Sequence, residues 1–162
     1  MTVWVCDGSG FRFRLAENVV DHLRQHRQLR WRDTEAGGPL YSRAPGRDCE
    51  VSEASGPFLK DRRMRHGYVP HRPSVQTDID QKHVLGLHFI GTWHTHPSAK
   101  PTASHLDVVS MLNLYRESAH DLDAFLMVIV GTDANPSTWE LSLHGEFGNG
   151  HVRQGGVIFR MA

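Results

Sequence analysis

The sequence predicts an α/β (α+β) domain in which a mixed β-sheet is flanked by helices. Short apolar or alternating segments, typical of strands, are interspersed with longer segments whose apolar residues recur at helical spacing. The continuous apolar run in residues 122–130 is typical of a central strand that is covered on both faces. Strands separated by helices indicate a sheet packed against those helices. The chain of 162 residues is long enough for a substantial core, and we expect a single domain over residues 1–162.

The N-terminal residues predict a β-hairpin followed by a helix. Residues 3–6 are apolar, and residues 11–15 alternate between apolar and polar side chains after a turn-type cluster, as expected for two strands with one buried face. From residue 16 to about residue 28, apolar residues recur at helical spacing. His22 and His26 lie four residues apart on this helix and could chelate a metal, although a packed or solvated helix face is the more common role of such a pair.

The next segment carries Glu35 and then a long irregular connection. We expect Glu35 to lie on a strand, and Pro39 indicates that this strand is at an edge of the sheet or is bulged there. Residues 48–53 alternate and predict the next strand of a hairpin or meander. Residues 55–73, rich in Gly, Pro and Arg, predict an insertion-type loop with a short strand over residues 67–71. Loops of this length are usually functional or mobile, so we weigh a partner contact equally against a plain solvated surface.

The second half of the chain predicts two helices and several strands. A helix is expected over residues 74–85, with Ser74 as its cap, and a buried strand begins with Leu87–Ile90. A second helix is expected over about residues 103–118. Further strands are expected over residues 122–130, 137–143 and 157–159.

Composition excludes several classes of function. Lysine plus arginine and aspartate plus glutamate number 18 each, so the chain has no net charge and no electrostatic signature of a nucleic-acid-binding protein. The N-terminus lacks a signal-peptide pattern and the longest apolar run has seven residues, so we expect no membrane span. Cys6 and Cys49 predict neither a disulfide framework nor a cysteine-based metal site, which favours a reduced, cytoplasmic protein.

Residues 91–107 hold the most informative pattern, in which two histidines, a serine and an aspartate are closely spaced. His94 and His96 are two residues apart at the end of a predicted strand, so both imidazoles can point to the same side. Ser104 and Asp107 are three residues apart and lie on one face of a predicted helix start. Two imidazoles and one carboxylate, with a fourth position open, are typical of a catalytic zinc site. The sequence therefore predicts one Zn²⁺ per chain, held by His94, His96 and Asp107.

Each half of this pattern also has a simpler explanation. Histidines are common on the wet face of a strand, and Ser-x-x-Asp is close to a helix capping box, which needs no metal. Other metal motifs fit the chain less well. The H-x-H-x-D-H pattern of metallo-β-lactamases is interrupted at Ser98-Ala99, and neither the zinc deaminase pattern nor H-E-x-x-H is present.

Joined together, the two halves form H-x-H-x7-S-x-x-D, which resembles the signature of the JAMM (JAB/MPN+) metalloproteases. This family also has an upstream glutamate followed by paired glycines, and Glu35-Ala36-Gly37-Gly38 matches that pattern. The resemblance covers most of the chain and implies the fold of the family, a curved mixed sheet flanked by helices that is similar to the cytidine deaminase fold. It also implies that Glu35 is the acid–base catalyst and that Ser104 donates to the oxyanion.

The WHTHP form of the motif and the Ser55-Gly56-Pro57 loop resemble a bacterial JAB subgroup found on integrative and conjugative elements and in antiphage operons, such as CBASS and ubiquitin-like conjugation systems. The resemblance implies a zinc isopeptidase that frees a ubiquitin-like protein or a conjugating-system C-terminus from a target, or matures a precursor. Pro39 departs from the subgroup, in which an apolar β-former is common. Two alternatives stay open: an MPN scaffold that binds partners without catalysis, and a JAB peptidase of sulfur-carrier proteins or cell-wall peptides. The expected partner is therefore a protein substrate.

Overall fold

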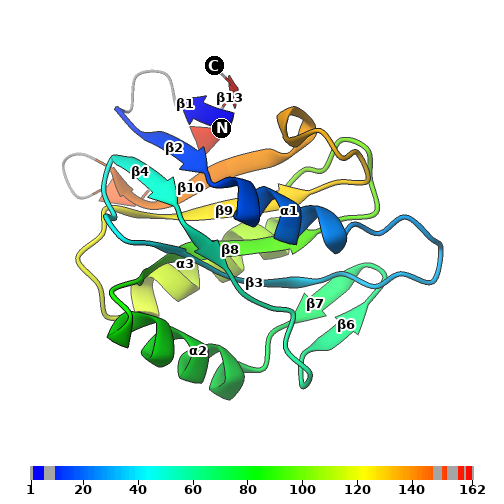
Figure 1. Ribbon diagram of the computed structural model, residues 1–162, viewed down its shortest axis with the longest axis horizontal. Coiled ribbons are helices and arrows are strands. Elements are labelled where there is room, and N and C mark those ends of the chain that lie inside the picture. Colours follow the sequence, from blue (N-terminus) through cyan, green and yellow to red (C-terminus); the bar gives the residue numbers. More distant parts are fainter. Residues whose placement is uncertain (1, 6–9, 148–150, 153–156, 159, 162) are drawn as a thin grey trace.

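The computed structural model describes residues 2–5, 10–147, 151–152, 157–158 and 160–161, in which a mixed sheet is flanked by helices (Figure 1). The helices are α1 (Glu17–Gln25), α2 (Arg72–Val84), α3 (His105–Glu117) and the 3₁₀ helix η1 (Pro136–Thr138). The strands are β1 (Thr2–Val5), β2 (Arg12–Leu15), β3 (Gly37–Ser42), β4 (Asp48–Val51), β5 (Glu53–Ala54), β6 (Arg62–Met64), β7 (Gly67–Val69), β8 (His88–Thr95), β9 (Ala124–Val130), β10 (Glu140–Phe147), β11 (His151–Val152), β12 (Val157–Ile158) and β13 (Arg160–Met161). The predicted α/β (α+β) class is confirmed.

The largest sheet has the strand order β11-β10-β9-β8-β3-β5, with β12 also paired to β10. Strands β8 and β9 are parallel, and the other described pairs in this sheet are antiparallel. A smaller sheet has the order β13-β1-β2-β4, and β6 and β7 form a separate hairpin. Because β8 and β9 are parallel, their carboxyl ends meet at one edge of the sheet, where ligand sites are commonly built.

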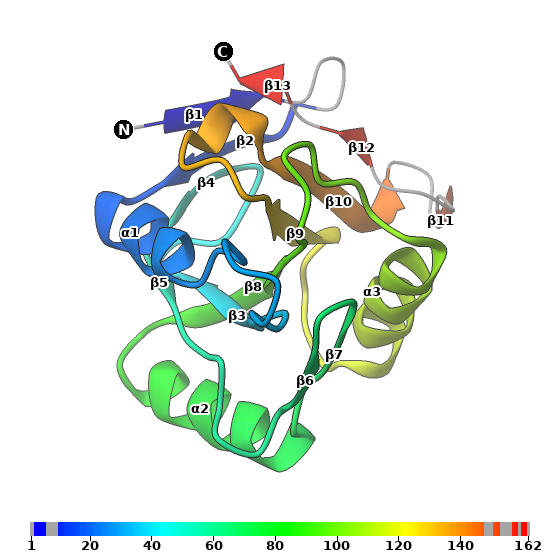
Figure 2. The same cartoon turned by 90° about the vertical axis from the view of Figure 1, so that its right-hand side faces the viewer.

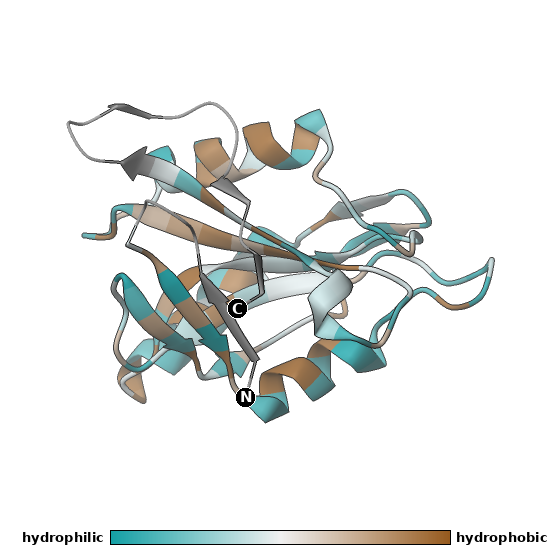
Figure 3. Ribbon diagram, turned by 90° about the horizontal axis from the view of Figure 1, so that it is seen from above, coloured by the Kyte–Doolittle hydropathy of each residue, from teal (hydrophilic) through white to brown (hydrophobic). Residues whose placement is uncertain are grey.

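Strand β9 lies at the centre of the core, because all seven of its residues are buried. Leu126 and Val128 belong to the hydrophobic cluster that contains α1 and the smaller sheet, whereas Phe125 and Met127 belong to the cluster beneath α3. Figure 2 shows α1 and α3 on opposite sides of the central strands, and Figure 3 shows that the loops at the rim are mostly hydrophilic. The predicted central strand over residues 122–130 is therefore confirmed.

Helix α2 packs less closely than the other two helices, since none of its residues is buried. It begins at Arg72, two residues earlier than predicted, and its cap is the side chain of His71, which accepts a hydrogen bond from the Ser74 amide. The prediction that Ser74 caps the helix is therefore wrong. Pro73 explains the earlier start, because a proline is well tolerated in a first turn, where its missing N–H has no intrahelical partner to lose.

Both ends of the chain agree in outline with the sequence pattern. The N-terminal hairpin is confirmed by the antiparallel pair β1–β2, while Cys6 and residues 7–9 lie outside the described residues. Strand β10 begins after η1 and extends beyond the predicted strand over residues 137–143, and β12 is the described part of the strand predicted over residues 157–159. None of the helices in the described part of the chain has the length and apolar character needed to span a bilayer.

The surroundings of β3 agree with the prediction only in part. Glu35 precedes this strand instead of lying on it, because β3 begins at Gly37. Of the two alternatives that Pro39 indicated, an edge position is wrong, since β3 lies between β8 and β5, and a bulge is supported, because the pairing with β8 is irregular directly after Leu40. The stretch over residues 48–53 is divided between β4, which pairs in parallel with β2, and β5, which pairs with β3. Alternation predicts which face of a strand is buried, but it does not specify the partner strand.

Candidate metal centre

The three residues predicted as metal ligands meet at the carboxyl end of β8. His94 lies in β8 and His96 directly follows the strand, where its amide donates to the carbonyl of Val130 at the end of β9 (2.9 Å). Asp107 comes from the first turn of α3. The exposed fractions of the His94, His96 and Asp107 side chains are 10%, 17% and 21%, so all three are largely but not completely withdrawn from solvent.

The donor atoms of these residues lie close enough together to hold one metal ion, because one ligand atom from each falls within 4.8 Å of the others. The two Nε2 atoms of His94 and His96 are 3.1 Å apart. Nε2 of His94 lies 3.4 Å from Oδ1 of Asp107, and Nε2 of His96 lies 3.4 Å from Oδ2. Zinc bonds of about 2.0–2.1 Å place neighbouring tetrahedral donors about 3.3–3.4 Å from one another. The chemistry of the donor set, two imidazoles and one carboxylate that converge within a few ångströms, therefore suits a zinc ion with a fourth position left for water or substrate.

Asp107 belongs to the candidate metal centre and to a capping box at the same time. Its Oδ2 accepts hydrogen bonds from the amide and the hydroxyl of Ser104, both at 2.7 Å, and the Asp107 amide donates to the Ser104 hydroxyl (3.1 Å). Its Oδ1 lies toward His94. The capping-box explanation and the metal explanation of Ser-x-x-Asp are thus compatible, because α3 begins at the centre and the cap holds the carboxylate beside the histidines.

The charges of the centre are strongly coupled. Burial alone would raise the pKa of Asp107, but hydrogen bonds from His94, His96 and Ser104 outweigh it and hold that pKa far below its usual range. Burial alone would lower the pKa of His96, but the hydrogen bond and charge of Asp107, together with the charge of Glu35, outweigh it and raise that pKa. Asp107 is therefore ionised at all ordinary pH values, as a metal ligand must be.

The carboxyl of Glu35 lies within electrostatic reach of the centre, and its environment shifts its pKa in the opposite direction. The residue is only 7% exposed, and burial raises the pKa of its carboxyl to about 7, with the charge of His96 opposing this rise and the charge of Asp107 adding to it. Glu35 is thus near enough to His96 and Asp107 for their charges to act on its pKa. A carboxyl with a pKa near neutrality can both take up and release a proton at working pH.

The backbone of Glu35 is held by the β6–β7 hairpin. Its amide donates to the carbonyl of Met64 (2.8 Å), and its carbonyl accepts from Nε of Arg63 (2.7 Å). The following pair of glycines lets the main chain from Ser55 onwards cross closely, because a Cβ on Gly38 would lie 2.0 Å from the Ser55 carbonyl oxygen. The paired glycines after Glu35 are therefore required by close backbone packing.

The other histidines singled out in the sequence are not part of this centre. The rings of His22 and His26 lie against Trp93, which is fully buried, and Nε2 of His22 is 2.8 Å from the carbonyl oxygen of Gly56. The interpretation of the pair as a packed helix face is confirmed. Within the described residues, the only group of three or more side chains with converging metal-ligand atoms is that of His94, His96 and Asp107.

Glu140 is a neighbour of the centre that sequence reasoning missed. Its Oε1 accepts a hydrogen bond from the Ala103 amide (2.8 Å), which ties the loop before α3 to the start of β10, and its negative charge contributes to the raised pKa of His96. No local pattern indicates this role, because Glu140 is more than thirty residues from the loop that it holds.

Comparison with known proteins places the chain beside a group of isopeptidases. No family model matches the sequence. Three curated relatives are named CD-NTase/cGAS isopeptidase. The relative from Pseudomonas aeruginosa is 29% identical over 83% of this chain and 86% of its own length. The relative from Escherichia coli is 31% identical over 59% of this chain and 64% of its own length, and the one from Vibrio cholerae is 29% identical over 70% of this chain and 72% of its own length. These relatives confirm the resemblance that the sequence motifs indicated.

Solved structures support the fold. A protein from Desulfitobacterium hafniense, known from its solution structure, aligns over 82% of this chain and 84% of its own, with a TM-score of 0.59 and 20% identity. A JAB1/MPN domain protein from Archaeoglobus fulgidus aligns over 87% and 96%, with a TM-score of 0.43 and 12% identity. The first of these similarities concerns the arrangement of helices and strands alone, and the second is too weak to add to it.

Proposed function

We propose that this chain is a single JAB/MPN+ metalloprotease domain that acts as a zinc-dependent isopeptidase. It releases a ubiquitin-like protein or a conjugating-system C-terminus from its target, or processes a precursor, in an antiphage pathway of the bacterial cytoplasm. The observation that carries this proposal is the spacing of the His94, His96 and Asp107 donor atoms beside a buried carboxyl at Glu35. Relatives named CD-NTase/cGAS isopeptidase support the same conclusion.

In this proposal His94, His96 and Asp107 hold one zinc ion per chain. When bound there, zinc supplies a Lewis acid that acidifies water and polarises the scissile carbonyl. Asp107 needs no proton loss to become a ligand, because its low pKa keeps it ionised. The cap formed with Ser104 also fixes its rotamer, so that the donor atoms are arranged before the metal binds.

Glu35 is the proposed proton carrier of the reaction. Its carboxylate accepts a proton from the attacking water and, as the carboxylic acid, returns one to the leaving lysine amine. Both steps need a group whose pKa lies near the working pH, and burial gives Glu35 a pKa of about 7. An exposed glutamate with a pKa near its ordinary value would be too weak a base for this task.

Ser104 is proposed as the hydrogen-bond donor to the developing oxyanion. Its hydroxyl donates to Oδ2 of Asp107 in this structure, at 2.7 Å. The hydroxyl must therefore turn from that oxygen toward the oxyanion, while its own oxygen continues to accept the Asp107 amide as the helix cap. A donor held beside the reacting carbonyl stabilises the charge that appears in the transition state.

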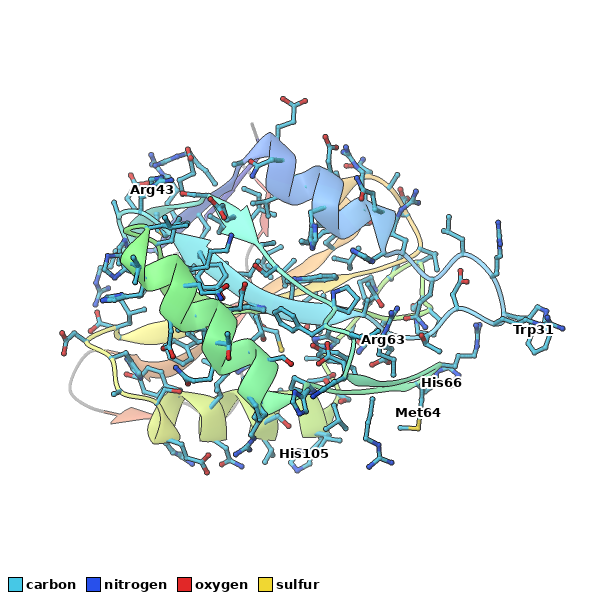
Figure 4. The ribbon with its side chains drawn as sticks, turned by 60° about the horizontal axis from the view of Figure 1, so that its bottom comes forward. Trp31, Arg43, Arg63, Met64, His66 and His105 are labelled. Atoms are coloured by element: carbon cyan, nitrogen blue, oxygen red, sulfur yellow. The ribbon has the colours of Figure 1, made fainter. Side chains whose placement is uncertain are left out.

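The protein substrate has an exposed surface to bind next to Glu35. The β6–β7 hairpin and the loop before Glu35 are joined by hydrogen bonds from Arg65 to the carbonyls of Arg30 and Trp31. Trp31 and Met64 are 73% and 55% exposed there, and Figure 4 shows them at the same end of the molecule as Arg63. Exposed apolar side chains beside an active centre favour a partner contact over a plain solvated surface.

The test is hydrolysis of a defined conjugate with and without a chelator. We would use a fusion in which a CD-NTase is joined through its C-terminus to a reporter protein. We expect cleavage at the junction, its loss with chelator and its return with Zn²⁺. Failure of the zinc-loaded wild type to cleave this fusion or a ubiquitin-like conjugate would contradict the proposal and favour the scaffold alternative.

Metal content tests the ligands separately from activity. The wild type should hold about one zinc per chain, whereas His94→Ala and Asp107→Asn should lose it. Asp107→Asn is preferred to alanine because the amide oxygen can still accept from Ser104 and so preserve the cap. His22→Ala is the matched control, since that histidine packs on Trp93 outside the centre. Full zinc occupancy in both ligand variants would refute the assignment.

A further inference from the structure

We propose that Gln28 is a positioning residue that fixes Glu35 relative to the metal ligands through Thr95. Gln28 lies just after α1 and takes no part in the centre by itself. It is nevertheless 3% exposed, and Thr95, between the two ligand histidines, is fully buried. The inference rests on the proposed function, because it assigns a role in the same reaction.

The side-chain amide of Gln28 is completely used in hydrogen bonds. Its NH₂ group donates to the carbonyls of Arg65 (2.9 Å) and Asp33 (3.2 Å), and its oxygen accepts from the hydroxyl of Thr95 (3.0 Å). One buried side chain therefore joins the loop before Glu35, the β6–β7 hairpin and the end of β8. Breaking one of these hydrogen bonds would leave a buried polar group with neither a protein partner nor water, which is costly. Buried polar groups that are fully paired in this way therefore hold the segments in one arrangement.

Thr95 passes this constraint on to Glu35. Its hydroxyl oxygen accepts from the Ala36 amide (3.0 Å), and its own amide donates to the Ala36 carbonyl (2.9 Å). Thr95 lies between His94 and His96 in the chain, and Ala36 directly follows Glu35. The ligand strand and the proton carrier are thus joined by two hydrogen bonds across one residue pair, and Gln28 orients the hydroxyl that makes one of them.

The same amide also supports the hairpin that holds the backbone of Glu35. Arg65, whose carbonyl accepts from Gln28, directly follows Met64, whose carbonyl accepts the Glu35 amide. Only a side-chain amide offers two donors and an acceptor in this geometry. Leucine has neither, and glutamate, when ionised, has no donor for the two carbonyls.

Loss of this hydrogen-bonded link should slow the chemical step without weakening the binding of the protein substrate. A displacement of about 1 Å between a catalytic group and its reaction partner can reduce a rate by about 100-fold, and loss of groups that orient metal ligands typically costs 10- to 100-fold. Binding of the protein substrate depends on the exposed surface instead. Loss of the Gln28–Thr95 bond should therefore lower kcat by about 10- to 100-fold and leave KM within about two-fold.

The experiment compares Gln28→Leu and Thr95→Val with Thr95→Ser, which keeps the hydroxyl. Kinetics are measured on the CD-NTase–reporter fusion with the zinc-loaded protein, together with zinc content and amide hydrogen exchange at Glu35 and Ala36. We expect reduced kcat, unchanged zinc content and faster exchange in the first two variants, with recovery of both readouts in Thr95→Ser. Tyr41→Phe is the control, because it removes a different buried hydrogen bond, from the Tyr41 hydroxyl to Asp78.

Two outcomes would overturn the inference. The first is a Thr95→Val variant that folds and keeps both the kcat of the wild type and its rate of amide hydrogen exchange at Ala36. The other is a loss of kcat in Tyr41→Phe as large as in Gln28→Leu, which would indicate a general loss of stability. If the wild type cleaves no fusion, the proposed function fails, but the exchange rates at Glu35 and Ala36 still show whether Gln28 holds this segment.

Discussion

Burial of Glu35 leads to a prediction about stability that needs neither substrate nor metal. The carboxyl has a pKa of about 7 in the folded chain and an ordinary value of 4.5, with burial as the main cause. Because the pKa of Glu35 is higher in the folded chain, folding favours the protonated carboxyl. The resulting contribution to stability is fully present below pH 4.5 and is lost as the pH rises through about 7. The interval between the two values corresponds to about 3 kcal/mol.

The perturbation is Glu35→Gln in metal-free protein. Glutamine is similar in size and carries no titrating group, so it removes the cost of an ionised carboxylate at this buried position. The free energy of unfolding of the variant, minus that of the wild type, should therefore become more positive as the pH rises. Most of the change, about 2.5 kcal/mol, should fall between pH 5 and pH 8 for a pKa of about 7.

The assay is urea denaturation of both proteins at closely spaced pH values, after removal of metal with a chelator. Tryptophan fluorescence, to which the fully buried Trp93 contributes, should report global unfolding. Glu117→Gln, at the exposed far end of α3, controls for the loss of one negative charge. A difference between Glu35→Gln and wild type that stays constant within about 0.5 kcal/mol from pH 5 to pH 8 would refute a raised pKa, and with it the suitability of Glu35 as a proton carrier at neutral pH.

Three further predictions concern the cap, the sheet and the substrate surface. Ser104→Ala should lower the free energy of unfolding by about 1 kcal/mol through loss of the helix cap, measured by urea denaturation, and should lose most of kcat because the hydroxyl donor is gone. Full activity of folded Ser104→Ala would exclude the oxyanion role. Gly91→Ala should destabilise the fold severely, because its Cβ would lie 1.8 Å from the Leu126 carbonyl oxygen. Gly86→Ala, where the Cβ meets open space, should cost only about 1 kcal/mol, and equal melting temperatures of the two variants would contradict this prediction. Trp31→Ser should raise KM for the fusion several-fold at constant kcat, and an unchanged KM would remove this side chain from the substrate surface.

The parts of the centre that were predicted from the sequence are those whose geometry is local. His94 and His96 are brought together by the two-residue period of a strand, and Asp107 follows from a helix that begins within the same segment. Glu35 is about sixty residues away, so only the resemblance to a family with a glutamate before paired glycines indicated it. Nothing in that resemblance indicated that Glu35 precedes its strand, where the β6–β7 hairpin holds it.

What could not be predicted depends on pairing between distant segments. The parallel pairing of β4 with β2 is set by how the whole chain packs, and the alternation of residues 48–53 is equally compatible with a hairpin. Gln28 looks like an ordinary polar residue at the end of a helix, and its importance follows only from the three segments that it joins. Glu140 is similar, because it acts on a loop that precedes it by nearly forty residues.

The surroundings that the fold provides shift the pKa values of Asp107 and Glu35 in opposite directions. Hydrogen bonds from His94, His96 and Ser104 outweigh burial at Asp107, so its pKa falls and it is always ready to bind a cation. At Glu35 burial dominates, and its pKa rises to about 7. A pair of acidic groups whose pKa values are separated in this way supports a division into one permanent anion and one proton carrier. The opposite assignment, with Glu35 as ligand and Asp107 as base, is disfavoured because Asp107 would be far too weak a base at neutral pH.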